Sequence, residues 1–194
     1  MGRISLKSQL VESGVTTVHK GGFSTSGVRE ITAAAHVAQG SFTNHFASKD
    51  EFGVAVIEDY FVGVRGVIRN TLENDELRPI ARIKSYFDAI TDLLENHGWR
   101  YGCLAGNMAL EASEHSELIR EKLIDVFASW TPPFSKVIRD AQVAEEVPQH
   151  VDATETGSAL LEAWQGAMLR MKIDRTPDPL DRFKRLTLPA LLSI

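Results

Sequence analysis

The stretch AQGSFTNHFASKDEF, residues 38–52, combines phenylalanines with a run of small polar side chains. Phe42 and Phe46 are four positions apart, so on a helix they lie on the same face. The opposite face then carries short polar groups, and the segments on both sides have the periodicity of ordinary amphipathic helices. This pattern predicts a short helix that aromatic rings anchor from behind and that presents polar side chains outward.

Apolar residues recur at helical spacing along almost the whole chain, and alternating β-branched runs are missing, which predicts an all-α fold. We expect Ser48 to cap the fourth helix and Pro132-Pro133 to break or kink the seventh near Trp130, because proline removes a helix hydrogen bond. Pro189 interrupts the last helix. The predicted helices cover about 4–18, 28–35, 39–45, 48–68, 78–97, 103–113, 115–143, 153–173 and 178–192.

Size and composition limit the class of protein. A chain of 194 residues that is 43% hydrophobic can bury a substantial core. It has no apolar run long enough to cross a membrane and no signal-peptide pattern in its first ten residues, so we expect a cytoplasmic protein without a membrane partner. The single cysteine, Cys103, excludes an internal disulfide and a thiolate metal cage. We expect neither a metal nor a cofactor.

Charge is distributed unevenly along the chain. Residues 1–50 contain five basic and three acidic residues, whereas the remainder contains 16 basic and 23 acidic residues. A slightly basic end on an acidic body fits a polyanionic partner that is held by a small surface.

The first three predicted helices, with a short turn before the third, are typical of a helix-turn-helix. The third helix would lie in a DNA major groove about 12 Å wide, where short polar groups reach base edges and phosphates. Gly40 would let the backbone approach a phosphate, and His45 and Lys49 suit phosphate contact. The alternative is a polar surface turn between two bundle helices. The predicted DNA contacts are Ser26, Arg29, Gln39, Gly40, Ser41, Thr43, Asn44, His45 and Lys49.

Residues 23–61 resemble the DNA-binding segment of TetR/AcrR-type transcriptional repressors. The resemblance implies a helix-turn-helix domain over residues 1–49, a larger ligand-binding and dimerisation domain over residues 50–194, and double-stranded DNA as partner. Gln39 and Thr43 replace the family's usual Lys and Tyr, which predicts weaker or more salt-sensitive DNA binding. The matching positions are Gly22-Phe23, Val28, Glu30-Ile31, Ala35, Val37, Gly40-Ser41-Phe42, His45-Phe46 and Ser48-Lys49-Asp50.

The segment ENHGWRYGCLAGNMALEASE, residues 95–114, places Cys103 at the start of a predicted helix. The positive end of the helix dipole and Arg100 would favour its thiolate, which electrophiles and oxidants attack. Together with residues 48–61 and 162–183, this segment resembles the TetR branch that contains the repressors of acrylate utilisation and of N-ethylmaleimide reductase. The resemblance implies a small unsaturated, carboxylated or thiol-reactive effector. The alternative is that Cys103 is a small buried hydrophobe.

Two other interpretations of this region remain open. In a non-covalent pocket, Arg100 would hold a carboxylate and aromatic residues would cover the carbon chain. In an enzyme, Cys103 would be the nucleophile and His97 its base, but no residue is evidently placed to orient the histidine, so we predict that the chain is not an enzyme. An all-α scaffold protein is a further alternative. The candidate sensor residues, of which the tryptophans are equally compatible with core packing, are Cys103, Trp99, Arg100, Tyr101, His97, Trp130 and Trp164.

The last two predicted helices are rich in leucine and other apolar residues, such as Leu160, Met168 and Leu186. One side can cover the rest of the chain while the other leaves apolar surface for a partner. In the family that the chain resembles, these helices pair into a symmetric four-helix bundle, which implies a homodimer on a palindromic operator. The alternative is that they only complete the core of one monomer.

Overall fold

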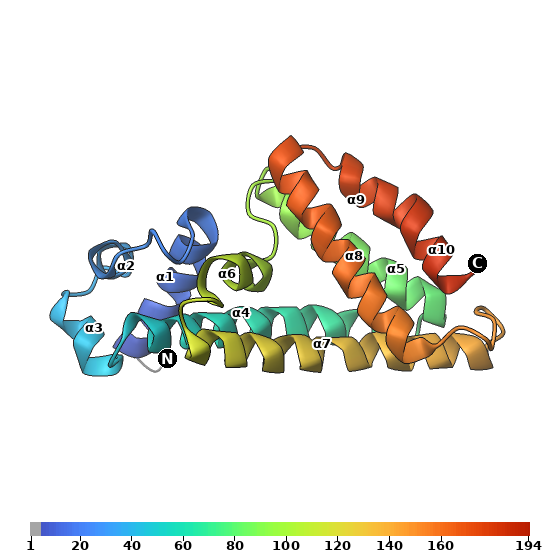
Figure 1. Cartoon of the computed structure of the whole chain (residues 1–194), viewed down its shortest axis with the longest axis horizontal. Coiled ribbons are helices and arrows are strands. Elements are labelled where there is room, and N and C mark those ends of the chain that lie inside the picture. The colour runs from blue at the N-terminus through green and yellow to red at the C-terminus, as the bar shows by residue number, and fades with distance from the viewer. Residues whose placement is uncertain (1–4) are drawn as a thin grey trace. The chain divides into compact units, whose positions relative to one another are not determined.

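The computed structural model of the chain describes residues 5–194, and the secondary structure of this part is helical, without a β-strand (Figure 1). The predicted all-α fold is confirmed, with small shifts at the helix ends; Ile4, predicted in the first helix, lies outside the described residues. The elements are α1 (Leu6–Gly21), α2 (Val28–Ala34), α3 (Gly40–His45), α4 (Lys49–Asn70), α5 (Pro79–Asn96), α6 (Leu104–Ala112), α7 (Glu117–Val143), α8 (Ala153–Asp174), α9 (Asp178–Arg182), the π-helical turn η1 (Phe183–Thr187) and α10 (Leu188–Leu192).

The chain divides into two compact units. The N-terminal unit consists of the chain up to Gly63 together with Cys103–Val126, and the C-terminal unit consists of Val64–Gly102 and Phe127–Ile194. The boundary predicted between residues 49 and 50 does not coincide with this division. The reason is that the first half of α4, α6 and the start of α7 pack with the N-terminal helices, so the sequence-continuous domain is not the compact unit.

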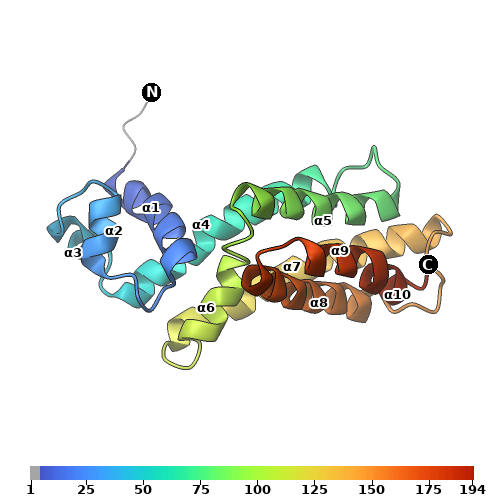
Figure 2. The ribbon, with the colours of Figure 1, turned by 90° about the horizontal axis from the view of Figure 1, so that it is seen from above.

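In the N-terminal unit, α1, α2 and α3 contact one another near the start of α4 (Figure 2). Phe42 of α3, Phe46 directly after α3 and Phe52 of α4 form a triad of buried rings, with centroids 5.2–5.4 Å apart. Aromatic pairs at such distances add to the free energy that ring burial provides. The prediction that Phe42 and Phe46 anchor the third helix is confirmed.

Local hydrogen bonds fix the two ends of the helix-turn-helix. After α2, His36 adopts a left-handed conformation with φ 55°, and the Val37 N–H donates to the Thr32 carbonyl at 3.0 Å. Before α4, the predicted cap is present: the Glu51 N–H donates to Ser48 Oγ at 3.0 Å. Glu51 in turn accepts from the Ala47 N–H at 2.6 Å, which resembles a capping box. These bonds mark the end of α2 and the start of α4.

The C-terminal unit is built around aromatic rings, and α8 lies beside α9 and α10 within it (Figures 1 and 2). Phe87 of α5 contacts Trp164 of α8 and Phe183 of η1, each with a centroid distance of 4.8 Å. Tyr86 packs edge-on against Phe134 of α7 at 4.9 Å. These rings are almost fully buried and join four elements into one core. None of the described helices is long and apolar enough to cross a membrane.

The prediction of a break at Pro132-Pro133 is wrong, because α7 continues as one helix from Glu117 to Val143. Each internal proline removes one helix hydrogen bond and costs about 3 kcal/mol or more. Trp130 and Phe134, on either side of the prolines, are 3% and 0% exposed. Burying such large rings contributes about 1.5–3 kcal/mol each, and this packing holds the helix across the prolines.

Substitution of Gly14 tests the packing of α1 on α4. A Cβ at this position would lie 2.3 Å from Phe52 Cζ and 2.9 Å from Val56 Cγ2. We expect Gly14→Ala to lower the free energy of unfolding by about 1–3 kcal/mol in urea denaturation, because overpacking forces neighbours to shift. Gly63→Ala on α4 is the control, since its Cβ meets no atom of the described residues within 4 Å. It should stabilise the helix by up to about 1 kcal/mol. Equal stability of Gly14→Ala and the unsubstituted protein would contradict this packing.

Candidate nucleic-acid interface and sensor site

Helix α3 has one buried and one exposed face. Phe42 is 3% exposed, whereas Thr43, Asn44 and His45 are exposed and Ser41 is half-buried. Gln39 and Gly40 at the start of α3 are exposed, and a Cβ at Gly40 would meet no atom of the described chain within 4 Å. The Ser41 and Phe42 N–H groups donate to the Ala38 and Gln39 carbonyls at 2.9 and 3.1 Å. The Thr43 hydroxyl donates to the Gly40 carbonyl at 3.1 Å, so its oxygen is left as an acceptor. Donors and acceptors of this size suit base edges and phosphates.

The three remaining predicted DNA contacts differ in accessibility. Arg29 on α2 is exposed. Lys49 is half-buried: its amino group donates to the Ser24 carbonyl at 3.1 Å and lies 4.7 Å from the Phe23 ring centroid. Burial lowers the pKa of the Lys49 amino group, while the carboxylates of Asp50 and Glu111 act in the opposite direction. Lys49 thus has a structural role in addition to any contact with phosphate.

Ser26 requires a correction. It is 1% exposed, and its hydroxyl donates to the Gly22 carbonyl at 2.6 Å. Its oxygen therefore stabilises the turn between α1 and α2 and is not available to DNA at the surface. The sequence placed Ser26 near the start of α2, but a small hydroxyl there satisfies a local backbone group.

Glu111 near the end of α6 holds the same turn from the other side. Its Oε2 accepts the Ser24 N–H at 3.0 Å. A Cβ at Gly22, where φ is 95°, would lie 2.9 Å from Glu111 Oε1, so only glycine allows this approach. The Ser24 backbone thus donates to Glu111 and accepts from Lys49. This contact ties α6 to the turn that precedes α2.

Cys103 is the N-cap of α6 and is 4% exposed. Its sulfur accepts the Gly106 N–H at 3.4 Å and the Tyr60 hydroxyl at 3.7 Å. The Tyr60 ring lies edge-on to His19 of α1, with centroids 5.7 Å apart. Cys103 therefore contacts a residue of α4 that itself contacts α1. The predicted position at a helix start is confirmed, and so is the burial that the alternative interpretation expects.

The other candidate sensor residues of the 97–101 connection are more open. His97 and Arg100 are exposed, while Trp99 and Tyr101 are half-buried. The rings of His97 and Tyr101 contact each other at a tilt of 35°, with centroids 5.0 Å apart. Trp99 has a left-handed backbone with φ 61°, and its carbonyl accepts from Arg175 at 3.4 Å. Trp99 therefore holds a strained backbone conformation within this connection.

Trp130 and Trp164 join the aromatic core of the C-terminal unit. Trp130 Nε1 donates to the Tyr86 hydroxyl at 2.8 Å, and Tyr86 packs on Phe87, which contacts Trp164. Within the described part of the chain, Trp164 Nε1 and Gln165 Nε2 are buried without a hydrogen-bond partner. An unpaired buried donor costs free energy, which favours an acceptor from another molecule at this place.

Sequence analysis did not identify Tyr60, Glu111 or Tyr86. Tyr60 is 43 positions from Cys103, and Glu111 is 87 positions from Ser24. No periodicity or motif relates residues at such separations, and a single sequence offers no other signal for them.

Comparison with known families identifies both parts of the chain. Residues 10–56 match the family described as bacterial regulatory proteins, tetR family. Residues 79–187 match the tetracyclin repressor-like C-terminal domain. The chain belongs to the TetR family. It is a TetR-family transcriptional repressor, with a helix-turn-helix followed by a larger helical part.

Individual relatives support the predicted branch. The chain is 38% identical to the HTH-type transcriptional repressor DhaR of Mycobacterium sp. (strain GP1), over 99% of this chain and 95% of DhaR. It is 33% identical to the transcriptional regulator AcuR of Cereibacter sphaeroides, over 91% and 80% of the two chains. It is 25% identical to the HTH-type transcriptional repressor NemR of Escherichia coli K12, over 90% and 88%. These relatives are transcriptional regulators by name, and the predicted branch is confirmed.

Solved structures share the fold. The regulatory protein TetR from Rhodobacter sphaeroides superimposes with a TM-score of 0.91 at 32% identity, over 96% of this chain and 99% of that one.

Glu111→Ala tests the contact between α6 and the turn before α2. The lost hydrogen bond contributes about 1 kcal/mol, so the Ser24 amide should exchange its hydrogen roughly fivefold faster. The exchange rate is measured by NMR. Glu111→Gln keeps an acceptor and should restore most of the protection. Glu114→Ala, which removes the same charge from a neighbouring but exposed residue, is the control. Unchanged exchange in Glu111→Ala would show that the bond does not protect this turn.

Proposed function

We propose that this TetR-family repressor binds a palindromic operator as a homodimer, with α3 of each copy in the major groove. We further propose that a small unsaturated, carboxylated or thiol-reactive compound releases it. The observation that carries the proposal is the division of α3 into a buried aromatic face and an exposed polar face.

The exposed residues of α3 and its surroundings suit two kinds of DNA contact. Asn44 can pair with an adenine edge, and Gln39 can do the same where the family usually has a cation. Arg29 and His45 would contact phosphates, and the open space at Gly40 would let a phosphate approach the backbone closely. Few cations lie on this surface, so we propose binding that is weaker at physiological salt than is usual for the family.

Exposed apolar residues on the last helices support the homodimer. Leu169 and Ile173 on α8 are 47% and 65% exposed, and Leu186 on η1 is 55% exposed. Covering such side chains against a second copy removes apolar surface from water. A two-fold dimer would present two copies of α3 to two half-sites of a palindromic operator.

Cys103 is the proposed site of reaction with electrophiles. The Tyr60 hydroxyl and the Gly106 N–H both point at its sulfur and would stabilise negative charge there during attack. Because the sulfur is buried, an adduct would have to displace neighbours. Tyr60 contacts both the sulfur and His19 of α1 and could transmit this displacement to α1. The modified protein would then favour a state that does not fit the operator.

A non-covalent effector is the second candidate, and it is favoured by the unpaired donor of Trp164. A carbonyl or carboxylate oxygen would satisfy this buried N–H group. Arg100, by contrast, is exposed, so the structure gives no support to its role as a buried carboxylate clamp.

Gly40→Ala tests the DNA interface. The new methyl group meets no atom of residues 5–194 within 4 Å, so stability should be unchanged or higher, whereas operator affinity should fall about tenfold through loss of a close phosphate approach. The measurement is a fluorescence anisotropy titration with duplex DNA from upstream of the protein's own gene. Gly63→Ala on α4 is the control.

The same titration tests the assembly. We expect two chains per palindromic duplex. Absence of a sequence-specific complex at low salt without effector would overturn the DNA-binding proposal, and a stoichiometry of one chain per duplex would overturn the homodimer.

Cys103→Ser tests the sensor. We expect N-ethylmaleimide and acrylate to release the unsubstituted protein from its operator and to leave Cys103→Ser bound, since serine keeps the N-cap but is a far weaker nucleophile. Tyr60→Phe should slow alkylation of Cys103, measured by mass spectrometry, because it removes one donor to the sulfur.

Equal release of both proteins by every compound would contradict covalent sensing and favour the pocket at Trp164. In that case Trp164→Phe, which keeps the ring and removes the donor, should weaken the response.

A further inference from the structure

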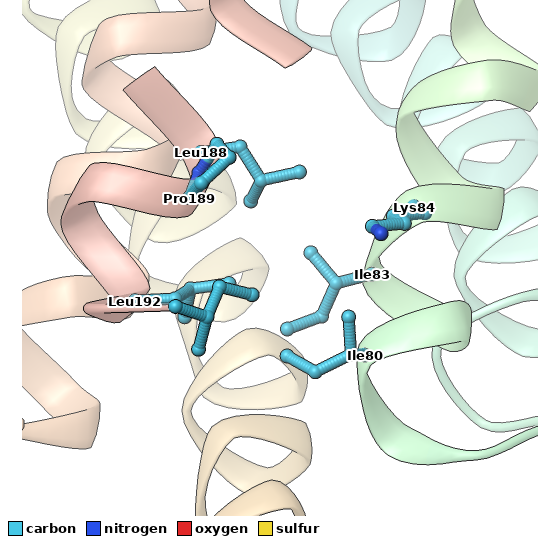
Figure 3. Close-up of a pocket in the computed structure, with 7 residues that line it drawn as sticks. Ile80, Ile83, Lys84, Leu188, Pro189 and Leu192 are labelled. Carbon is cyan, nitrogen blue, oxygen red and sulfur yellow. The ribbon is translucent and has the colours of Figure 1, made fainter. Parts of the chain in front are cut away.

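The C-terminal unit contains a second candidate site, away from its aromatic core. The first turns of α5 face α10 across a cavity of about 370 Å³ (Figure 3). Its walls are apolar: Ile80 and Ile83 come from α5, and Leu188 and Leu192 come from α10. Figure 3 shows these four side chains directed toward one another across the space. The volume is near the lower end of the range for small-molecule sites.

The π-helical turn η1 creates one wall of this cavity. The buried residues Phe183, Leu188 and Leu192 are five and four positions apart, and the Leu188 N–H donates to the Phe183 carbonyl. A regular α-helix would bring Thr187 inward, four positions after Phe183. The extra residue of the π turn places Leu188 there, with Pro189 following it at the cavity. Such turns are costly and occur frequently at functional sites.

Among the described residues that line this cavity, Lys84 of α5 has the only charged side chain, and this side chain is exposed. Ile194, the last residue of the chain, also lines the cavity. The carboxylates that could neutralise it are already engaged. Asp88, one turn further along α5, accepts from Lys184 at 3.1 Å. Glu146 pairs with Arg78 at 2.6 Å and accepts the Ile80 N–H at 2.9 Å.

The engagement of these acids leaves the Lys84 ammonium group without an ion-pair partner among the described residues. Lys84 lies on α5 at the edge of the space between α5 and α10 (Figure 3). A single unpaired cation beside an apolar cavity is complementary to a molecule with one negative end and a hydrocarbon body.

We propose that this cavity binds a small amphiphilic monocarboxylate, with its chain between the isoleucines of α5 and the leucines of α10 and its carboxylate on Lys84. The cavity volume fits a hydrocarbon chain of medium length and is too small for an acyl group attached to a large carrier molecule. Binding here is non-covalent and belongs to the C-terminal unit, whereas Cys103 belongs to the N-terminal unit. The site is therefore independent of the thiol chemistry proposed above.

The test is isothermal titration calorimetry with octanoate and, as the neutral probe, octan-1-ol. The protein carries Cys103→Ser, so that the result does not depend on the sensor proposal. We expect one octanoate per chain and clearly weaker binding of octan-1-ol. Lys84→Gln should weaken octanoate about fivefold, the upper range for an exposed ion pair, and leave octan-1-ol unchanged. Leu192→Phe, which fills the cavity, should weaken both.

Lys20→Gln removes an exposed lysine from the N-terminal unit and serves as the charge-matched control, with unchanged affinity expected. The proposal is overturned if octanoate shows no saturable binding, if octan-1-ol binds as tightly as octanoate, or if Lys84→Gln retains full affinity. It is also overturned if Lys20→Gln loses as much affinity as Lys84→Gln, because the effect would then reflect net charge. Circular dichroism of each variant establishes that the fold is retained.

Discussion

The contact among the rings of Phe42, Phe46 and Phe52 is the constraint on which the proposed function of this protein depends. A helix as short as α3 is not stable by itself in water. The hydrogen bonds of a six-residue helix do not offset the free energy that helix nucleation costs. The triad supplies the missing free energy and also sets the rotation of the helix. Because Phe42 and Phe46 point inward, the side chains between them, Thr43, Asn44 and His45, are directed outward. The exposed polar surface is thus a consequence of the buried aromatic one.

Helix α6 contacts other helices of the N-terminal unit at both of its ends. Cys103, the N-cap of α6, contacts Tyr60, which in turn contacts His19 of α1. Its last turn carries Glu111, which holds the turn before α2. Coupling between two sites requires an element whose arrangement both sites can bias. A helix attached at both ends to the DNA-binding segment is such an element, and this gives the proposed sensor a physical route to α3.

Local chemistry was predicted well where neighbours in sequence decide the outcome. The Ser48 cap, the Phe42 and Phe46 face and the position of Cys103 at a helix start all depend on residues within one or two turns. The predictions failed where distant packing outweighs a local preference. The burial of the Trp130 and Phe134 rings keeps α7 helical across Pro132 and Pro133. The turn before α2 buries Ser26, which the local pattern had placed at the surface.

The sequence by itself determined the all-α fold, the helix-turn-helix and the membership of the TetR family, because helical periodicity, capping and the spacing of α3 are short-range properties of the chain. Only the tertiary structure decided which residues meet across long separations: Tyr60 with Cys103, Glu111 with Ser24, and α5 with α10 around Lys84. These contacts arise from the packing of whole helices, including the extra residue in η1. Their free energy is shared among many buried side chains, so no single segment of sequence encodes them.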